Sequence, residues 1–251
     1  MKNILNKKLI ERYSRQLVLK DVGTTGQKII IKSKVLVVGA GGLGCPVIDY
    51  LSRAGVGNIG IIDDDKVNIS NIHRQSLYDS SDIDKSKVIV LKKKIKLINP
   101  LVKIKIFKER IGKKNIKKIF KNYDFIVDGS DNFKTKFLLN KYSLKYKKIL
   151  IVGAISKMDG HIFTFDFKNK TDPCLKCFYQ AEPSDEMLNC EYEGILGPVA
   201  GIVGNIQALE VLKKILKIED KSNNKILILD LSKLNFRKVE FKKKTSCICK
   251  N

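Results

Sequence analysis

Four glycines in this sequence could form a binding site for a phosphate group. They stand close together, as Gly39, Gly41, Gly42 and Gly44. An apolar run at 35–38 precedes them and an apolar segment beginning at Cys45 follows, so the predicted order is strand, tight turn and helix. Glycine lets backbone N–H groups approach an anion, and the start of the following helix supplies partial positive charge. The spacing alone is equally typical of a dinucleotide site, a mononucleotide site and a structural turn.

Three consecutive carboxylates follow the next predicted strand, which spans 58–62: Asp63, Asp64 and Asp65. Asp63 is 24 residues beyond Gly39 (63 minus 39). Doubly wound folds place a carboxylate against a ribose hydroxyl at this point. The spacing therefore strengthens the prediction of a nucleotide site, without separating NAD from ATP.

Amide and basic side chains follow the three carboxylates in the sequence. At this position they would bind a triphosphate better than a nicotinamide. Asn71, Arg74 and Gln75 lie together, and Lys87 falls in the first turn of a predicted helix. In a chain so rich in lysine, Lys87 could be an ordinary surface residue. Its position directly after the arginine cluster favours a role in the site.

A P-loop is excluded by the residues after the glycines. Cys45 and Pro46 stand where that motif needs a lysine and a hydroxyl residue. The cation that binds the phosphates must therefore come from elsewhere in the chain. Arg74 and Lys87 are the candidates, with Arg15 as a third.

Asp131 follows the buried strand predicted at 123–127. Ligands of open α/β sheets gather beyond the carboxyl ends of the strands, so we expect Asp131 to face the same crevice as the glycines. A carboxylate there could hold Mg²⁺ against phosphates. Asp131 could instead only cap the helix predicted over 132–146. Polar groups at the neighbouring strand ends favour the role in the site.

The six cysteines are unevenly distributed. Four form two close pairs, Cys174 with Cys177 and Cys247 with Cys249. In a reducing compartment such pairs indicate a metal site before a disulfide. Of the other two, Cys45 is predicted to pack in the core.

The composition favours one large domain over 1–251, because 251 residues with 43% hydrophobic content can bury a full core. The N-terminal segment lacks the apolar region of a signal peptide. No stretch approaches the ~18 apolar residues that a membrane helix needs. We therefore expect a cytoplasmic protein with no membrane partner.

The formal net charge of +23 raises the question of nucleic acid. Only six of the 49 basic residues are arginine, and the lysines are spread along the whole chain. Recognition of nucleic-acid phosphates favours the arginine fork, so we expect no nucleic-acid partner. Abundant lysine, isoleucine and asparagine is typical of a strongly A+T-rich genome.

These candidate residues must be positioned by alternating strands and helices. The pattern predicts an N-terminal helix at 7–20, ended by Gly23 and Gly26, a nucleotide-binding half at 34–152 and a C-terminal half at 153–251. The C-terminal half is predicted to contain a polar loop, a helix and two strands, at 180–197, 199–217, 226–231 and 236–241.

Taken together, the motifs resemble those of the ThiF/MoeB/HesA adenylyltransferases, which are relatives of the ubiquitin-activating enzymes. The resemblance spans nearly the whole chain, in order. Besides the glycines and the cysteine pairs, it is carried by Arg12-Tyr13-Ser14-Arg15-Gln16, Gly55-Val56-Gly57, 63–65, 70–75, Lys87, 130–132 and Gly197-Pro198. Segments 182–183, 189–190 and 207–210 are most similar to ThiF, the activator of the thiamine sulfur carrier. MoeB, which activates the molybdopterin sulfur carrier, is the alternative.

The resemblance implies a Rossmann-like, doubly wound α/β fold, with a mostly parallel sheet, antiparallel C-terminal strands and a zinc knuckle. It implies that ATP, Mg²⁺ and the C-terminal Gly-Gly tail of a ubiquitin-like sulfur-carrier protein bind together. The tail carboxylate would attack the α-phosphate, giving an acyl-adenylate and pyrophosphate. Because a carboxylate is already nucleophilic at neutral pH, catalysis would depend on positioning and on neutralising phosphate charge.

The resemblance also implies a role for each candidate residue. Asp63 would hold the ribose, with Asp65 beside it in the nucleotide site. Arg74, Lys87 and Arg15 would bind the phosphates, and Arg15 would do so across a homodimer. Asp131 would bind Mg²⁺, and Asn71 and Gln75 would support these residues.

The four paired cysteines would form a structural Zn²⁺ site. Here the sequence departs from the family, because Cys247 and Cys249 form a C-x-C where C-x-x-C is usual. Cys190 matches the cysteine that takes part in acyl or sulfur transfer, although it could be an ordinary buried cysteine. The sulfur itself would come from a separate donor protein that carries a persulfide.

Two other classes of protein share some of these features. An NAD-dependent oxidoreductase would explain the glycines and Asp63, but it would not explain Arg74, Lys87 or Asp131. A binding module that only docks a ubiquitin-like tail would not need a full set of phosphate-binding groups.

Overall fold

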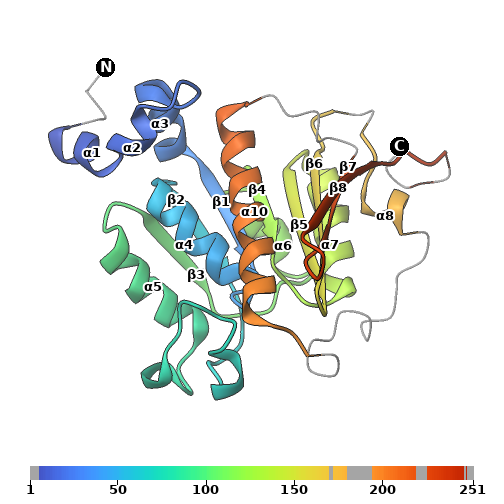
Figure 1. Ribbon diagram of the computed structural model, residues 1–251, viewed down its shortest axis with the longest axis horizontal. Helices are drawn as coiled ribbons and strands as arrows, with labels where there is room; N and C mark the ends of the chain where they lie inside the picture. The colour runs from blue at the N-terminus through green and yellow to red at the C-terminus, as the bar shows by residue number, and fades with distance from the viewer. Residues whose placement is uncertain (1–5, 170–171, 180–193, 219–224, 246, 248–251) are drawn as a thin grey trace.

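The computed structural model describes residues 6–169, 172–179, 194–218, 225–245 and 247 (Figure 1). Its centre is one eight-stranded sheet with the strand order β3-β2-β1-β4-β5-β6-β7-β8. The strands are β1 (Lys34–Val38), β2 (Asn58–Ile62), β3 (Lys103–Phe107), β4 (Phe125–Asp128), β5 (Ile149–Ser156), β6 (Asp159–Asp166), β7 (Lys225–Asp230) and β8 (Asn235–Glu240).

The first five strands pair in parallel and the last three pair antiparallel. Chain order reverses at β1, which lies between β2 and β4. This is the switch point where doubly wound folds form a crevice at the carboxyl ends of the strands. The predicted α/β fold, with a mostly parallel sheet and antiparallel C-terminal strands, is confirmed.

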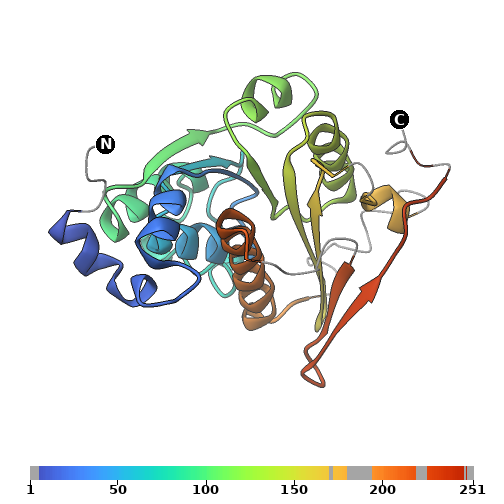
Figure 2. The same ribbon diagram turned by 90° about the horizontal axis from the view of Figure 1, so that it is seen from above.

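Helices cover both faces of the sheet, as Figure 2 shows from above. The face that buries Val35, Val37 and Ile61 is covered by α4 (Gly44–Ala54), α5 (Lys87–Ile98) and α10 (Gly197–Leu216). The opposite face is covered by α6 (Ile116–Phe120), α7 (Phe133–Lys145) and α8 (Leu175–Phe178). Apolar residues therefore face both ways along the central strands, as expected for a parallel sheet buried on both sides.

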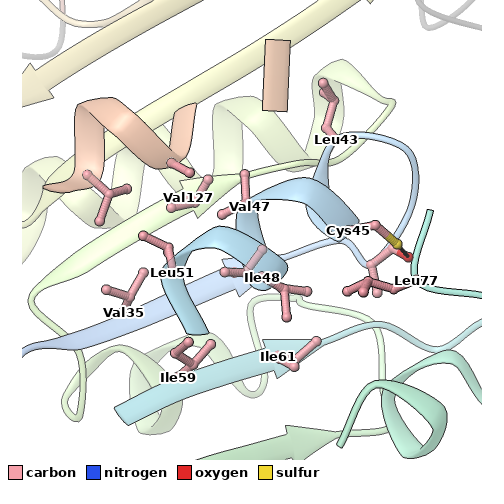
Figure 3. Packing of buried hydrophobic residues seen from close by; sticks show 14 of the residues in the cluster. Val35, Leu43, Cys45, Val47, Ile48, Leu51, Ile59, Ile61, Leu77 and Val127 are labelled. Atoms are coloured by element: carbon pink, nitrogen blue, oxygen red, sulfur yellow. Dashed lines mark hydrogen bonds between the residues drawn. The ribbon is translucent and has the colours of Figure 1, made fainter. Parts of the chain in front are cut away.

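Cys45 lies inside the first of these two layers, on α4 (Figure 3). Its side chain is fully buried near Leu77, and burial raises the pKa of the thiol to about 12. A thiol held protonated in this way is a poor nucleophile. The structure confirms that Cys45 packs in the core.

The N-terminal segment differs from the prediction of one helix over 7–20. Two short helices, α1 (Lys7–Arg12) and α2 (Ser14–Leu17), are separated at Tyr13, and α3 (Gly23–Lys32) follows. The predicted helix end at Gly23 and Gly26 was wrong, because both residues belong to α3. A Cβ atom at Gly26 would lie 2.8 Å from Leu216 Cδ2. Close packing against α10 therefore outweighs the low helix propensity of glycine at this position.

Two glycines on α10 give a matched test of this close packing. A Cβ atom at Gly204 would lie 2.6 Å from the carbonyl oxygen of Leu43, whereas one at Gly201 would meet nothing within 4 Å. Gly201→Ala should raise the free energy of unfolding by about 0.5 kcal/mol, and Gly204→Ala should lower it by roughly 1–3 kcal/mol. Urea unfolding of both variants measures these values. Equal effects would show that α10 does not press against the glycine turn.

Among the described helices, none combines the length and the apolar character needed to cross a membrane.

Candidate active site

A cavity of about 500 Å³ opens at the carboxyl ends of the parallel strands, which is a typical size for a small-ligand site. Ten of the predicted site residues line it: Gly39, Gly41, Gly42, Asp63, Asp65, Asn71, Arg74, Gln75, Lys87 and Asp131. The fold thus brings together residues that are up to 92 positions apart in the sequence (131 minus 39).

The glycine turn forms one wall of the cavity. Gly39 has φ +92°, and a Cβ atom there would lie 2.7 Å from the carbonyl oxygen of Gly129. Gly44 is the first residue of α4, behind the turn, and a Cβ atom on it would collide with the carbonyl oxygen of Gly39. Gly44 is therefore needed for close packing of the turn and does not itself line the cavity. The N-terminus of α4, which begins at Gly44, adjoins the turn.

Asp63 is fixed by two backbone hydrogen bonds. Its Oδ2 accepts from the Ala40 N–H at 2.7 Å, and its Oδ1 accepts from the Asp65 N–H at 2.8 Å. Burial raises the pKa of the Asp63 carboxyl, and the nearby positive charge of Lys87 opposes that shift. A carboxylate has about four acceptor positions, so it can still accept a hydrogen bond from a ligand hydroxyl.

Lys87 is a buried cation at the edge of the cavity. It is the first residue of α5, and its side chain is 6% exposed. Its Nζ lies 2.9 Å from Asp65 Oδ2, while the Asp65 side chain is 64% exposed. Asp65 thus holds the lysine in place from the solvent side. A phosphate entering the cavity would meet an ammonium group that is already oriented.

The loop after β2 supplies a guanidinium and an amide. Arg74 is tied back to its own loop, because its Nη1 donates to the carbonyl oxygen of Ser70 at 2.8 Å. Gln75 is buried against the glycine turn, and its Oε1 has no hydrogen-bond partner among the described residues. A buried polar atom without a partner indicates that a ligand or water completes the site.

Asp131 lines the cavity and is exposed. The helix cap is its neighbour Asn132, whose side chain accepts from the Thr135 N–H at 2.9 Å. Asp131 is therefore not used as the cap of α7. Mg²⁺ is usually held by one or two carboxylates together with substrate phosphates and water, and the single carboxylate of Asp131 fits that pattern.

Arg15 does not line this cavity. Its neighbours are anchored at the C-terminal end of α4, where Tyr13 lies against Gly55 and Gln16 donates to the Ala54 carbonyl oxygen at 3.4 Å. The cavity adjoins the other end of α4. The 11 residues of this helix separate the two ends by roughly 16 Å. Arg15 is exposed on α2 (Ser14–Leu17), which lies at that far end of α4.

Tyr13 anchors this N-terminal segment through a buried hydrogen bond. Its hydroxyl accepts from Asn99 Nδ2 at 3.0 Å, and the side chain is 2% exposed. We expect Tyr13→Phe to lower the free energy of unfolding by about 1 kcal/mol. The matched control is Tyr50→Phe, because Tyr50 is 51% exposed, and it should cost less than about 0.5 kcal/mol. Equal values in urea unfolding would contradict the anchoring role.

Three buried polar residues at or next to the cavity were not predicted as site residues from the sequence, and one of them, Lys136, lines the cavity. Lys136 pairs with Asp128 at 3.4 Å, and Gln207 donates to the Asp128 carbonyl oxygen at 2.9 Å. The only signal for Asp128 was its place at the end of a strand. Lys136 is one of 43 lysines (49 minus 6 arginines), so nothing in its type set it apart.

A second cluster lies away from the cavity. The sulfur atoms of Cys174, Cys177 and Cys247 all lie within 4.8 Å of one another. Cys174 and Cys247 are separated by 73 positions, and their Sγ atoms are 3.5 Å apart. Three converging thiols fit the donor chemistry of zinc. The predicted fourth ligand, Cys249, and the predicted reactive Cys190 both lie outside the described residues.

Comparison with known proteins decides the family. The model of the ThiF family matches residues 13–250. The chain belongs to the ThiF family.

Individual relatives agree with this assignment. A Thermus thermophilus protein named sulfur carrier protein adenylyltransferase is 36% identical over 245 residues, covering 96% of this chain and 90% of that protein. A Dictyostelium discoideum protein named adenylyltransferase and sulfurtransferase MOCS3 is 40% identical over 239 residues, covering 94% of this chain and 56% of that protein. The chain thus spans little more than half of the MOCS3 relative. The prediction that this ThiF-family chain is an adenylyltransferase is confirmed.

A solved structure shares the fold. The crystal structure of Escherichia coli MccB with MccA-N7isoASN has a TM-score of 0.83 and 22% identity, covering 98% of this chain and 76% of that one. At this identity the likeness shows the architecture alone.

Proposed function

We propose that this protein adenylylates the C-terminal Gly-Gly carboxylate of a ubiquitin-like sulfur-carrier protein, using ATP and Mg²⁺ and releasing pyrophosphate. The observation that carries the proposal is the meeting of Lys87, Arg74 and Asp131 with the glycine turn around one cavity. An NAD site would not need this combination of two cations and a carboxylate beside the phosphate-binding turn. The names of the relatives support the same chemistry.

In this proposal the nucleotide lies along the strand ends. Asp63 accepts a hydrogen bond from the ribose, and the N–H groups of the glycine turn face the phosphates. Lys87 and Arg74 neutralise charge on the phosphates and on the departing pyrophosphate. Mg²⁺ bound by Asp131 would add positive charge at the phosphate oxygens. The tail carboxylate needs no base, so the chain mainly has to align it with the α-phosphorus.

The direct test is exchange of labelled pyrophosphate into ATP. We expect exchange only when a carrier with an intact Gly-Gly tail is present, because reversal of the reaction needs the acyl-adenylate. A carrier without its last glycine is the control. Equal exchange with and without the carrier would contradict the proposal.

The choice of carrier has two candidates. The ThiF-like segments of the sequence support a carrier of thiamine thiazole biosynthesis. A Gracilaria tenuistipitata relative named probable molybdopterin-synthase adenylyltransferase, 36% identical over 228 residues, supports a carrier of molybdopterin synthesis. Comparing kcat/KM for the two purified carriers in the exchange assay distinguishes the routes, and the carrier that is used at least tenfold better identifies the route.

We also propose that the cysteine cluster holds one structural Zn²⁺, with Cys249 as the fourth ligand. Thiolate ligands tie the segment around α8 to the C-terminal segment, so metal binding should contribute to folding. Protein purified without chelator is expected to contain about one zinc per chain, and Cys177→Ser should lose it and melt at a lower temperature. Less than about half an equivalent in the unmodified protein would contradict this site.

Downstream of adenylylation, we propose that Cys190 takes part in forming the thiocarboxylate with sulfur from a separate persulfide donor. Cys190→Ala should then retain pyrophosphate exchange and lose thiocarboxylate formation. Thiocarboxylate formation at the original rate would show that Cys190 has no such role.

A further inference from the structure

Lys136 occupies an unusual place for a lysine. It lies in the first turn of α7, where the helix dipole disfavours a positive charge, and its side chain is 1% exposed. Lysine is almost never fully buried unless it is paired. The contacts made by its Nζ must therefore offset a considerable cost.

Three acceptors surround the Lys136 ammonium group. Its Nζ donates to the carbonyl oxygen of Gly153 at 2.6 Å and to that of Ser130 at 2.7 Å. The carboxylate of Asp128 is farther away, at 3.4 Å. Burial raises the pKa of the Asp128 carboxyl, and the charge of Lys136 opposes that shift. An ammonium group has three donors, so these contacts occupy them all and leave none for a phosphate.

The two carbonyl bonds fix two segments that line the cavity, one around Ser130 and one around Ala154. The carbonyl of Ser130 and the N–H of Asp131 share one planar peptide group, so holding the oxygen fixes the backbone from which the Asp131 side chain extends. Asn132 Nδ2 donates to Asp131 Oδ1 at 3.2 Å from the other side. In the same way, the Gly153 carbonyl sets the peptide that leads to Ala154, which lines the cavity.

We propose that Lys136 is a positioning residue that holds the Asp131 carboxylate in the orientation needed to bind the Mg²⁺ of MgATP. This rests on the proposed function for the role of Asp131, and it assigns Lys136 no contact with the substrate. The two short bonds to backbone carbonyls are the essential ones, and the ion pair with Asp128 serves to keep the buried lysine charge tolerable.

The test measures how ATP raises the melting temperature at increasing Mg²⁺ concentrations, without any carrier. In Lys136→Met, we expect the half-saturating Mg²⁺ concentration to rise about tenfold or more, with stabilisation by ATP in EDTA unchanged. Lys134→Met is the matched control, because Lys134 lies exposed on the same turn of α7, and it should behave like the unmodified protein. Lys136→Arg, which keeps the charge and the donors, should restore most of the Mg²⁺ response.

A double variant separates positioning from charge balance. Lys136→Met alone leaves Asp128 buried without its cation and could prevent folding, whereas Asp128→Asn with Lys136→Met removes both charges. We expect the double variant to recover part of the melting temperature that Lys136→Met loses, because the charge imbalance is removed while the two carbonyls still lack their donor, and the weakened Mg²⁺ response should remain. An unchanged Mg²⁺ response in either folded variant would overturn the proposal.

This outcome is independent of the carrier. If the unmodified protein binds ATP in a Mg²⁺-dependent way but gives no carrier-dependent exchange, the proposed function fails and the role of Lys136 stands. If exchange occurs and the Mg²⁺ response of the variants is unchanged, the role of Lys136 fails alone.

Discussion

Lys87→Met is expected to reduce carrier-dependent adenylylation by about 10²–10³-fold. The ammonium group is buried at the cavity edge and is held at 2.9 Å by Asp65 before any ligand arrives. A preoriented cation in a partly dry site stabilises developing phosphate charge far more than one in water. Methionine keeps the length and apolar stem of the side chain, so the variant should remain folded.

The control for Lys87 is Lys92→Met, on the exposed side of the same helix. We expect this variant to keep its activity within about twofold, since exposed substitutions away from a site have small effects. Single-turnover formation of the acyl-adenylate, with melting temperatures of both proteins, gives the comparison. A folded Lys87→Met protein that keeps more than a third of its activity would remove Lys87 from the phosphate site.

Arg15→Ala should be nearly as damaging, although Arg15 is remote from the cavity of its own chain. Its neighbours Tyr13 and Gln16 are anchored at the end of α4 that lies away from the glycine turn. If Arg15 acts on phosphate, it must therefore do so in the site of a second copy. We propose a homodimer in which each chain supplies Arg15 to the other.

Co-expression of two inactive variants tests whether each chain supplies Arg15 to the site of the other. Arg15→Ala and Asp131→Asn should each be nearly inactive alone. Co-expressed in equal amounts, they should recover about a quarter of the original activity, because about half of the dimers are mixed and each mixed dimer has one complete site. Each variant taken alone through the same preparation is the control. Two inactive variants that stay inactive in a mixture known to contain mixed dimers would contradict action across the dimer.

The elements of the nucleotide-binding half could be predicted because their signals are local. The apolar run before Gly39 gives β1, and the acidic residues after Ile62 mark the end of β2. Since parallel strands end at the same edge of a sheet, these positions were enough to expect Asp63 and Asp131 at one crevice. The cavity that they line together agrees with this expectation.

What could not be predicted depends on contacts between distant segments. Helix α3 contains Gly26 because Leu216 packs too closely there to leave room for a larger side chain. Leu216 is 190 residues away in the sequence (216 minus 26). The burial of Lys136, on α7, depends on the carbonyl oxygen of Gly153, which lies on β5. Neither contact changes the hydrophobic periodicity or the choice of turn residues, so both contacts can be found only in the folded chain.

The most direct test of the central claim is the intact mass of the carrier after incubation with this protein, ATP and Mg²⁺, followed by rapid acid quenching. We expect a carrier heavier by one AMP group, with the added mass located at its C-terminal glycine and equimolar pyrophosphate released. A carrier of unchanged mass in the presence of folded protein that binds ATP would contradict the proposal that this chain adenylylates a ubiquitin-like tail.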